Sequence, residues 1–242
     1  MNVHSPDGKP ATSIRPAKPA AERERITILR RSWLTLEMLL LFVLTPIAVY
    51  SLLYDFRIPL FTLLPGVFVL FIVLLTLDWS FSWHGLLGTG IRLRDLLSIA
   101  AVFALAGPAL VLFAYVDGPG RMFGLYSLNH ELWLRIIILY SLLSVTAQEI
   151  MYRVFFFHRY RSLFGGDAQA GIVLNAVLFS FSHIVFQNVT TLIISFLGGL
   201  LFAWRYESSR SYWALVLEHS LYGSLIFTVG LGRYFYTGVS NF

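Results

Sequence analysis

The sequence predicts an all-α protein, a polytopic bundle of about seven transmembrane helices. Of its 242 residues, 57% are hydrophobic and only 13% are charged, which is far from the average of soluble domains. Apolar stretches close to the roughly 20 residues that cross a bilayer also recur along the chain. They fall at residues 33–54, 58–78, 96–116, 133–157, 171–187, 188–204 and 212–236. We therefore expect an integral membrane protein.

Two parts of the chain differ in composition. Residues 1–31 are rich in proline, alanine and charge, which predicts a disordered cytoplasmic arm. Residues 32–242 are expected to form a single bundle, because no internal repeat indicates a duplicated transporter architecture. The first apolar stretch lacks a small-residue cleavage site after a short core, so we expect it to remain as a transmembrane helix.

Basic residues at alternate ends of the predicted spans indicate the orientation. They are Arg23, Arg25, Arg30, Arg31, Arg92, Arg94, Arg159, Arg161, Arg205 and Arg210. These ends should be cytoplasmic, which puts the N-terminus inside, and the short loops are typical of a bacterial inner membrane. This topology and anionic lipid headgroups explain the net charge of +5, so no nucleic-acid partner is needed.

Ionisable residues within the spans are candidates for function, because a membrane interior disfavours charge. They are Glu37, Glu149, Arg153, His183, Glu218 and His219. Glu37 lies near the expected cytoplasmic end of its span, so we interpret it as structural. The absence of cysteine excludes thiolate nucleophiles and cysteine metal sites.

The stretch TAQEIMYRVFFFHRY at residues 146–160 carries several of these polar groups. Glu149 and Arg153 are four residues apart, so one helical face can pair them. A structural ion pair is the simplest interpretation of these two residues. Gln148 lies about 100° around the helix from Glu149, and Tyr152 continues the face of Gln148.

Two later spans bring further polar groups. His183 ends the segment FSFSH, while Glu218 and His219 lie in VLEHSLYGS. A glutamate, a glutamine and two histidines in a dry cavity can polarise a water molecule, with histidine as base or oxyanion donor. The pattern therefore fits peptide-bond hydrolysis, with Glu149, His183, His219 and Gln148 as catalytic candidates and Arg153, Tyr152 and Glu218 in support.

Over residues 133–230 these segments resemble the CPBP intramembrane endopeptidases, which include the type II CAAX prenyl endopeptidases. The family motifs EExxxR, FxxxH and HxxxN or HxxxD correspond here to QEIMYR, FSFSH and HSLYG. The resemblance implies that Gln148 and His183 occupy the water-activating positions, and that His219 and Gly223 occupy the oxyanion positions. It also implies a metal-free, glutamate-type enzyme that cleaves a membrane-associated or lipid-modified protein.

Two positions depart from the family pattern. Gln148 can orient water but cannot accept its proton, so either Glu149, after a helix rotation, or His183 must act as base. Gly223 lacks an oxyanion-binding side chain, a loss worth about 10²–10³ in rate unless Tyr222 or Ser224 compensates.

Three alternatives remain open from the sequence. A catalytically impaired protein of this fold could serve as a binding, immunity or assembly factor. Glu149, His183 and His219 could instead form a zinc site with an open position for water. His183 and His219 could also be axial ligands of a haem. The hydrolase itself requires no cofactor, and its expected partners are the lipid bilayer and a membrane-associated protein or peptide substrate.

Overall fold

The computed structural model describes residues 20–237, with side chains from residue 27 onward. Every regular element in that part of the chain is a helix, which confirms the predicted all-α class. Six helical segments are long and apolar enough to span a membrane: Thr27–Tyr54, Leu60–Leu77, Leu93–Asp117, His130–Phe164, Ala168–Phe186 and Val189–Ser209. The seventh predicted span corresponds to α12 (Tyr212–Thr228), whose 17 residues lie at the short end of the spanning range.

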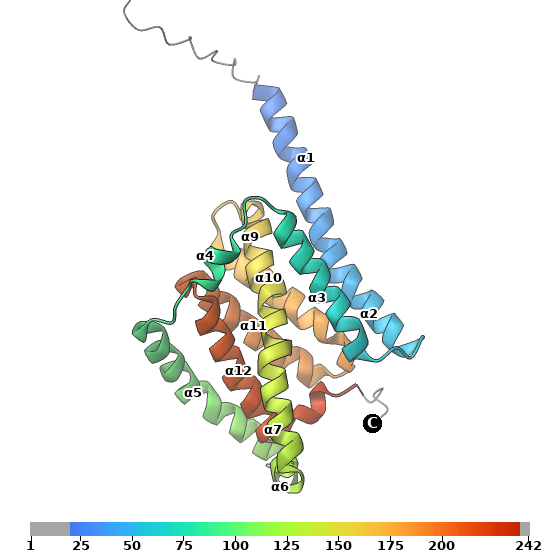
Figure 1. Cartoon of the computed structure of the whole chain (residues 1–242), viewed down its shortest axis with the longest axis vertical. Helices are drawn as coiled ribbons and strands as arrows, with labels where there is room; N and C mark the ends of the chain where they lie inside the picture. Colours follow the sequence, from blue (N-terminus) through green and yellow to red (C-terminus); the bar gives the residue numbers. More distant parts are fainter. Residues whose placement is uncertain (1–19, 238–242) are drawn as a thin grey trace, which may run out of the picture.

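The first half of the chain forms the outer part of the bundle. Its helices are α1 (Ala20–Leu39), α2 (Thr45–Tyr54), α3 (Leu60–Leu77), α4 (Trp83–Leu87) and α5 (Leu93–Asp117). Figure 1 shows α1 extending beyond the other helices, and α5 at the edge of the bundle beside α12. An apolar groove of about 700 Å³ runs along α5, with Phe103, Gly107, Pro108 and Leu225 among its lining residues.

Residues 20–31 are helical, where composition predicted a disordered arm. The segment AAERERITILRR contains mainly alanine, glutamate, arginine and leucine or isoleucine, and the first three have high helix propensity. This local preference continues the first spanning helix toward the N-terminus. Residues 1–19 of the predicted arm lie outside the described part of the chain.

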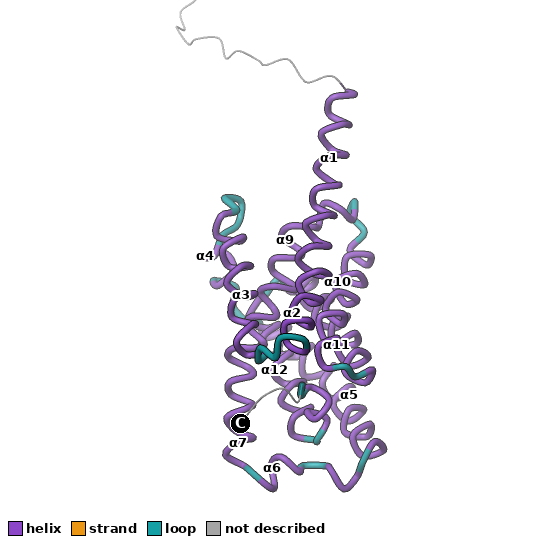
Figure 2. Tube along the Cα trace, turned by 90° about the vertical axis from the view of Figure 1, so that its right-hand side faces the viewer, coloured by secondary structure: helices purple, strands orange, loops and turns teal. Residues whose placement is uncertain are grey.

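The second half holds the helices that carry the candidate site. They are α6 (Gly124–Leu128), α7 (His130–Leu139), α8 (Thr146–Glu149), α9 (Phe156–Tyr160), α10 (Ala168–Ser182), α11 (Val189–Ser209) and α12. Figure 2 shows α6 at the end of the bundle opposite to the start of α1. The segment from α7 to α9 is one continuous helix that passes through the bundle.

Two π-helical stretches, Tyr140–Val145 and Ile150–Phe155, interrupt that continuous helix on either side of α8. A π-helical turn changes which face each side chain occupies, and such turns are frequent at functional sites. The second stretch is fully buried, so the segment from Glu149 to Phe155 is enclosed by other helices.

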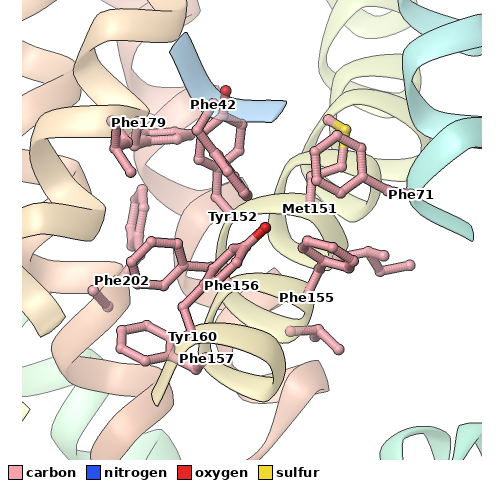
Figure 3. Packing of buried hydrophobic residues seen from close by; sticks show 14 of the residues in the cluster. Phe42, Phe71, Met151, Tyr152, Phe155, Phe156, Phe157, Tyr160, Phe179 and Phe202 are labelled. Carbon is pink, nitrogen blue, oxygen red and sulfur yellow. The ribbon is translucent and has the colours of Figure 1, made fainter. Parts of the chain in front are cut away.

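The core around this helix is largely aromatic (Figure 3). Phe42 makes edge-to-face contacts with Phe71, Tyr152 and Phe156, at centroid distances of 5.4, 5.2 and 5.7 Å. Interlocked aromatic pairs of this kind contribute beyond their buried area. They fix the central helix against α3 and against the helix that contains α1 and α2.

A polar cluster closes the end of the bundle where α1, α3 and α9 meet. Arg159 donates two hydrogen bonds to Glu37, of 2.8 and 2.9 Å, and His158 Nε2 lies 3.1 Å from Asp78 Oδ2. Glu37 therefore makes a structural contact. Hydrogen bonds from the Ser80 hydroxyl and backbone N–H, together with His158, hold the pKa of Asp78 below its usual value, although partial burial opposes them.

Candidate active site

Glu149 and Arg153 face each other at the centre of the bundle. Both side chains are fully buried, and Arg153 Nη1 lies 3.4 Å from Glu149 Oε1, as their four-residue spacing predicts. Burying either charge without the other would be strongly unfavourable. The two residues therefore compensate one another in the interior.

His219, on α12, completes this group from another helix. Its Nδ1 lies 2.6 Å from the same Glu149 oxygen that faces Arg153. The imidazole stacks on Phe202 of α11 at a centroid distance of 4.3 Å, which limits its rotation. The ring is thus held by a carboxylate at one edge and by an aromatic surface on one face.

Aromatic rings also hold the guanidinium group of Arg153. Its Cζ lies 4.1 Å from the centroid of Phe179 and 5.4 Å from that of Phe202, which are cation–π distances. None of its three side-chain nitrogens has a hydrogen-bond partner. Figure 3 shows Phe179 and Phe202 on the side of the aromatic core away from Phe71.

His183 lies at the C-terminal end of α10, in a short 3₁₀ turn from His183 to Phe186. Its Nδ1 is 2.8 Å from the Phe179 carbonyl oxygen. Because a carbonyl only accepts hydrogen bonds, Nδ1 carries the hydrogen and the neutral ring keeps its lone pair on Nε2. The Phe179 ring lies beside the rings of both His183 and His219, at centroid distances of 4.8 and 6.0 Å. The two histidines therefore pack against the same side chain.

Gln148 and Tyr152 lie on a neighbouring face of the central helix. The Gln148 amide nitrogen donates to Ser144 Oγ at 2.8 Å, while its Oε1 is buried without a hydrogen-bond partner, as is Glu149 Oε2. Buried acceptors of this kind are normally satisfied by protein or by water. Tyr152 packs against Phe179 at 5.2 Å and belongs to the wall of the site.

Glu218 does not join Glu149. It accepts two hydrogen bonds from Arg205, of 2.6 and 3.0 Å, and Arg205 also donates to Ser98 at 2.9 Å. Both charged side chains are almost completely buried. Arg205 lies near the C-terminal end of α11, and its side chain turns into the contact between α5, α11 and α12, where Glu218 and Ser98 bind it.

Glu149, His183 and His219 all fall within one segment that matches a known protein family. Residues 129–225 match the type II CAAX prenyl endopeptidase Rce1-like family. The resemblance predicted from the three motifs is confirmed, and the family is one of intramembrane proteases. Comparisons with curated proteins and with solved structures gave no match.

The Rce1-like region also contains Gly223, which faces Tyr140. A Cβ atom on Gly223 would lie 2.5 Å from Tyr140 Cζ and 2.6 Å from its hydroxyl oxygen, so a side chain and the tyrosine exclude each other. The Tyr222 ring packs against Phe103 at a centroid distance of 5.1 Å, and its buried hydroxyl has no hydrogen-bond partner among the described residues. Sequence reasoning missed Tyr140, since no spacing rule links it to α12.

The cofactor alternatives find little geometric support in the Rce1-like region. Among the described residues, no group of three or more histidine, aspartate or glutamate side chains is placed to hold a metal ion. The two ring nitrogens of His219 face Glu149 and Tyr140, and His183 Nδ1 faces a backbone carbonyl. Both ring nitrogens of His219 are therefore engaged, whereas the hydrogen-bond contacts of His183 involve its Nδ1.

Proposed function

We propose that this protein is an intramembrane endopeptidase that hydrolyses a peptide bond in a membrane-associated protein without a metal ion. The observation that carries the proposal is the 2.6 Å contact between fully buried Glu149 and His219, beside Arg153. These groups lie inside the segment that matches an endopeptidase family. Structural packing alone would favour apolar residues at such a place, because buried ionic groups often lower stability.

His183 is the proposed general base. Its Nδ1 contact with the Phe179 carbonyl leaves the Nε2 lone pair available to take a proton from water. Gln148 Oε1, which has no partner within the protein, would accept the other hydrogen of that water and orient it. This division of roles explains how a glutamine can occupy the position where the family has glutamate.

The reaction then proceeds through ordinary acyl transfer to water. The water oxygen attacks the carbonyl carbon of the substrate, and one water proton passes to His183 Nε2 as the C–O bond forms. The C–N bond breaks next, and that proton passes from His183 to the leaving nitrogen. The products are a new carboxyl terminus and a new amino terminus.

Glu149 has a different role from the base in this proposal. Its Oε1 is already shared between His219 and Arg153, so it serves to orient the imidazole of His219 and to compensate the buried cation. His219 in turn faces the Tyr140 hydroxyl with its Nε2, at 3.0 Å, so both of its ring nitrogens are engaged and it acts through the groups that it orients.

The substrate class follows from the family match rather than from the site. Residues 129–225 match the type II CAAX prenyl endopeptidase Rce1-like family. This match favours a substrate that is cleaved near a C-terminal or lipid-modified segment. The arginine distribution favours a cytoplasmic N-terminus, and the short loops favour a bacterial inner membrane.

The proposal is tested by comparing newly exposed protein termini in membranes of the native host. The host would express the wild type, His183→Ala, or the control His84→Ala, at matched protein levels. His84 is exposed on the short helix α4, so its loss removes a histidine without touching the site. We expect termini shared by the wild type and His84→Ala that are missing with His183→Ala.

Identical terminus profiles from all three proteins would contradict hydrolysis. That result would instead favour a binding, immunity or assembly factor that keeps the fold of the Rce1-like family.

A further inference from the structure

The ring of Tyr140 sits on the face of α12 at Gly223. Any side chain at position 223 would overlap that ring, since even a Cβ atom would approach its Cζ to 2.5 Å. Tyr140 is the first residue of the π-helical stretch Tyr140–Val145, and it is half-buried. The glycine on one helix and the tyrosine on the other therefore form one matched contact.

The Tyr140 hydroxyl also extends the polar chain of the site. It lies 3.0 Å from His219 Nε2, while His219 Nδ1 lies 2.6 Å from Glu149. A carboxylate, an imidazole and a hydroxyl thus follow one another at hydrogen-bonding distance. This is the order in which acid, base and hydroxyl groups cooperate in many hydrolytic sites.

The hydroxyl itself is not needed to hold the ring in place. The ring packs on the rings of Phe227 and His219, at centroid distances of 5.2 and 6.0 Å, and a phenylalanine ring would make the same contacts. The oxygen, by contrast, is directed at a ring nitrogen that Glu149 orients from the opposite side. Packing alone explains the position of the Tyr140 ring. The position of its hydroxyl beside His219 Nε2 indicates a separate, chemical role for the oxygen.

We propose that Tyr140 is a catalytic residue whose hydroxyl donates a hydrogen bond to the substrate carbonyl oxygen as negative charge develops there. This inference rests on the proposed endopeptidase function. Rotation about the Cζ–Oη bond redirects the hydrogen from His219 Nε2 to the substrate without moving the ring. No covalent bond of Tyr140 forms or breaks, and the hydrogen stays on the tyrosine.

The roles of Gly223 and Tyr140 are then coupled. Gly223 removes a side chain from α12, and Tyr140 brings a donor to the same place from the central helix. A hydrogen-bond donor of this kind is worth about 10²–10³ in kcat. The absence of a polar side chain at position 223 is therefore compatible with an active enzyme.

The first test uses the full-length protein in lipid vesicles and a peptide that spans a cleavage site found in the host membranes. Tyr140→Phe keeps the ring and removes only the hydroxyl, so we expect kcat to fall by about 10²-fold, with KM nearly unchanged. Tyr212→Phe is the matched control, because its hydroxyl donates to the backbone carbonyl of Thr146 at 3.3 Å rather than to His219. We expect that control to retain the wild-type kcat.

A second pair of variants tests the coupling to Gly223. Gly223→Ala should lower kcat because its methyl group displaces the Tyr140 ring. The double variant Tyr140→Ala with Gly223→Asn supplies a carboxamide donor from α12 in place of the phenol. We expect it to be faster than Tyr140→Ala alone.

An unchanged kcat for Tyr140→Phe, while His183→Ala is inactive, would overturn the role of Tyr140 and leave the proposed function standing. An equal fall in kcat for Tyr140→Phe and Tyr212→Phe would also overturn it, because a general loss of packing would then explain both variants. If no terminus in the host membranes depends on the wild-type protein, both proposals fail together.

Discussion

The protein contains two buried pairs of arginine and glutamate, and they are built differently. Arg205 and Glu218 form two hydrogen bonds of 2.6 and 3.0 Å, and Ser98 accepts a third from the arginine. Arg153 and Glu149 approach only to 3.4 Å, and the arginine nitrogens have no hydrogen-bond partner.

This difference separates a structural pair from a candidate site. A satisfied pair fixes the helices that carry it, whereas unsatisfied buried groups call for a further explanation. Glu149 Oε2 and Gln148 Oε1 are buried acceptors without partners, and His219 shares the other Glu149 oxygen. Polar groups left available in the interior are what binding and polarising a substrate requires.

The largest effect should follow from breaking the satisfied pair. Glu218→Ala leaves the buried guanidinium of Arg205 without its carboxylate, so we expect a loss of roughly 3–5 kcal/mol of stability. Thermal unfolding in detergent and the amount of protein in the membrane would both report it. A variant that unfolds at the wild-type temperature would show that the Arg205 pair is not structural.

Replacing that whole pair should be far milder. Arg205→Met with Glu218→Leu removes both charges at once, and such swaps are often neutral or stabilise by about 1–4 kcal/mol. The double variant should therefore unfold at or above the wild-type temperature and cleave the same peptide at a similar rate. If a stable double variant no longer cleaved the peptide, the Arg205–Glu218 pair would be required for activity, and the distinction between a structural pair and a catalytic pair would be wrong.

A substitution at Gln148 tests the candidate site around Glu149 instead of the structural pair. Gln148→Glu places a group that can accept a proton beside the base, so the cleavage rate should rise by about tenfold, or roughly 1.4 kcal/mol in activation free energy. The peptide assay measures it directly. A slower variant would indicate that the amide of Gln148, which donates to Ser144, is itself required.

The smallest effect concerns the polar cluster at the end of the bundle. The pKa of Asp78 is lowered in the folded protein, so its contribution is present above the unfolded value of about 3.9 and lost as the pH falls through the folded value. The contribution should be under about 1 kcal/mol, since the cluster is partly exposed. Unfolding temperatures at pH 7 and pH 3 should differ less for Asp78→Asn than for the wild type, and equal differences would contradict this role.

Local patterns predicted much of this structure. Apolar length located the spanning helices, and the four-residue spacing placed Glu149 opposite Arg153. These predictions succeed because each depends on one helix and its periodicity. The three motif segments likewise predicted the resemblance to the type II CAAX prenyl endopeptidase Rce1-like family, whose model matches residues 129–225.

Contacts between helices were harder to predict. The pairing of Arg205 with Glu218 joins α11 to α12, and the position of Arg205 near a span end did not predict this partner. Tyr140 reaches His219 across the bundle through a π-helical stretch. Both depend on the packing of separate helices and on local changes of helical register, which single-helix periodicity does not report.

The central claim is that the group around Glu149 supports hydrolysis, and one measurement tests it most directly. Protein termini would be compared in host membranes containing the wild type, Glu149→Gln, or Glu131→Gln at matched levels. Glu131 precedes Glu149 on the same continuous helix and is exposed, paired with Arg135, so it controls for the loss of a carboxylate. We predict that Glu131→Gln produces every terminus that the wild type produces and that Glu149→Gln produces none of them. A full set of termini from Glu149→Gln would contradict the account.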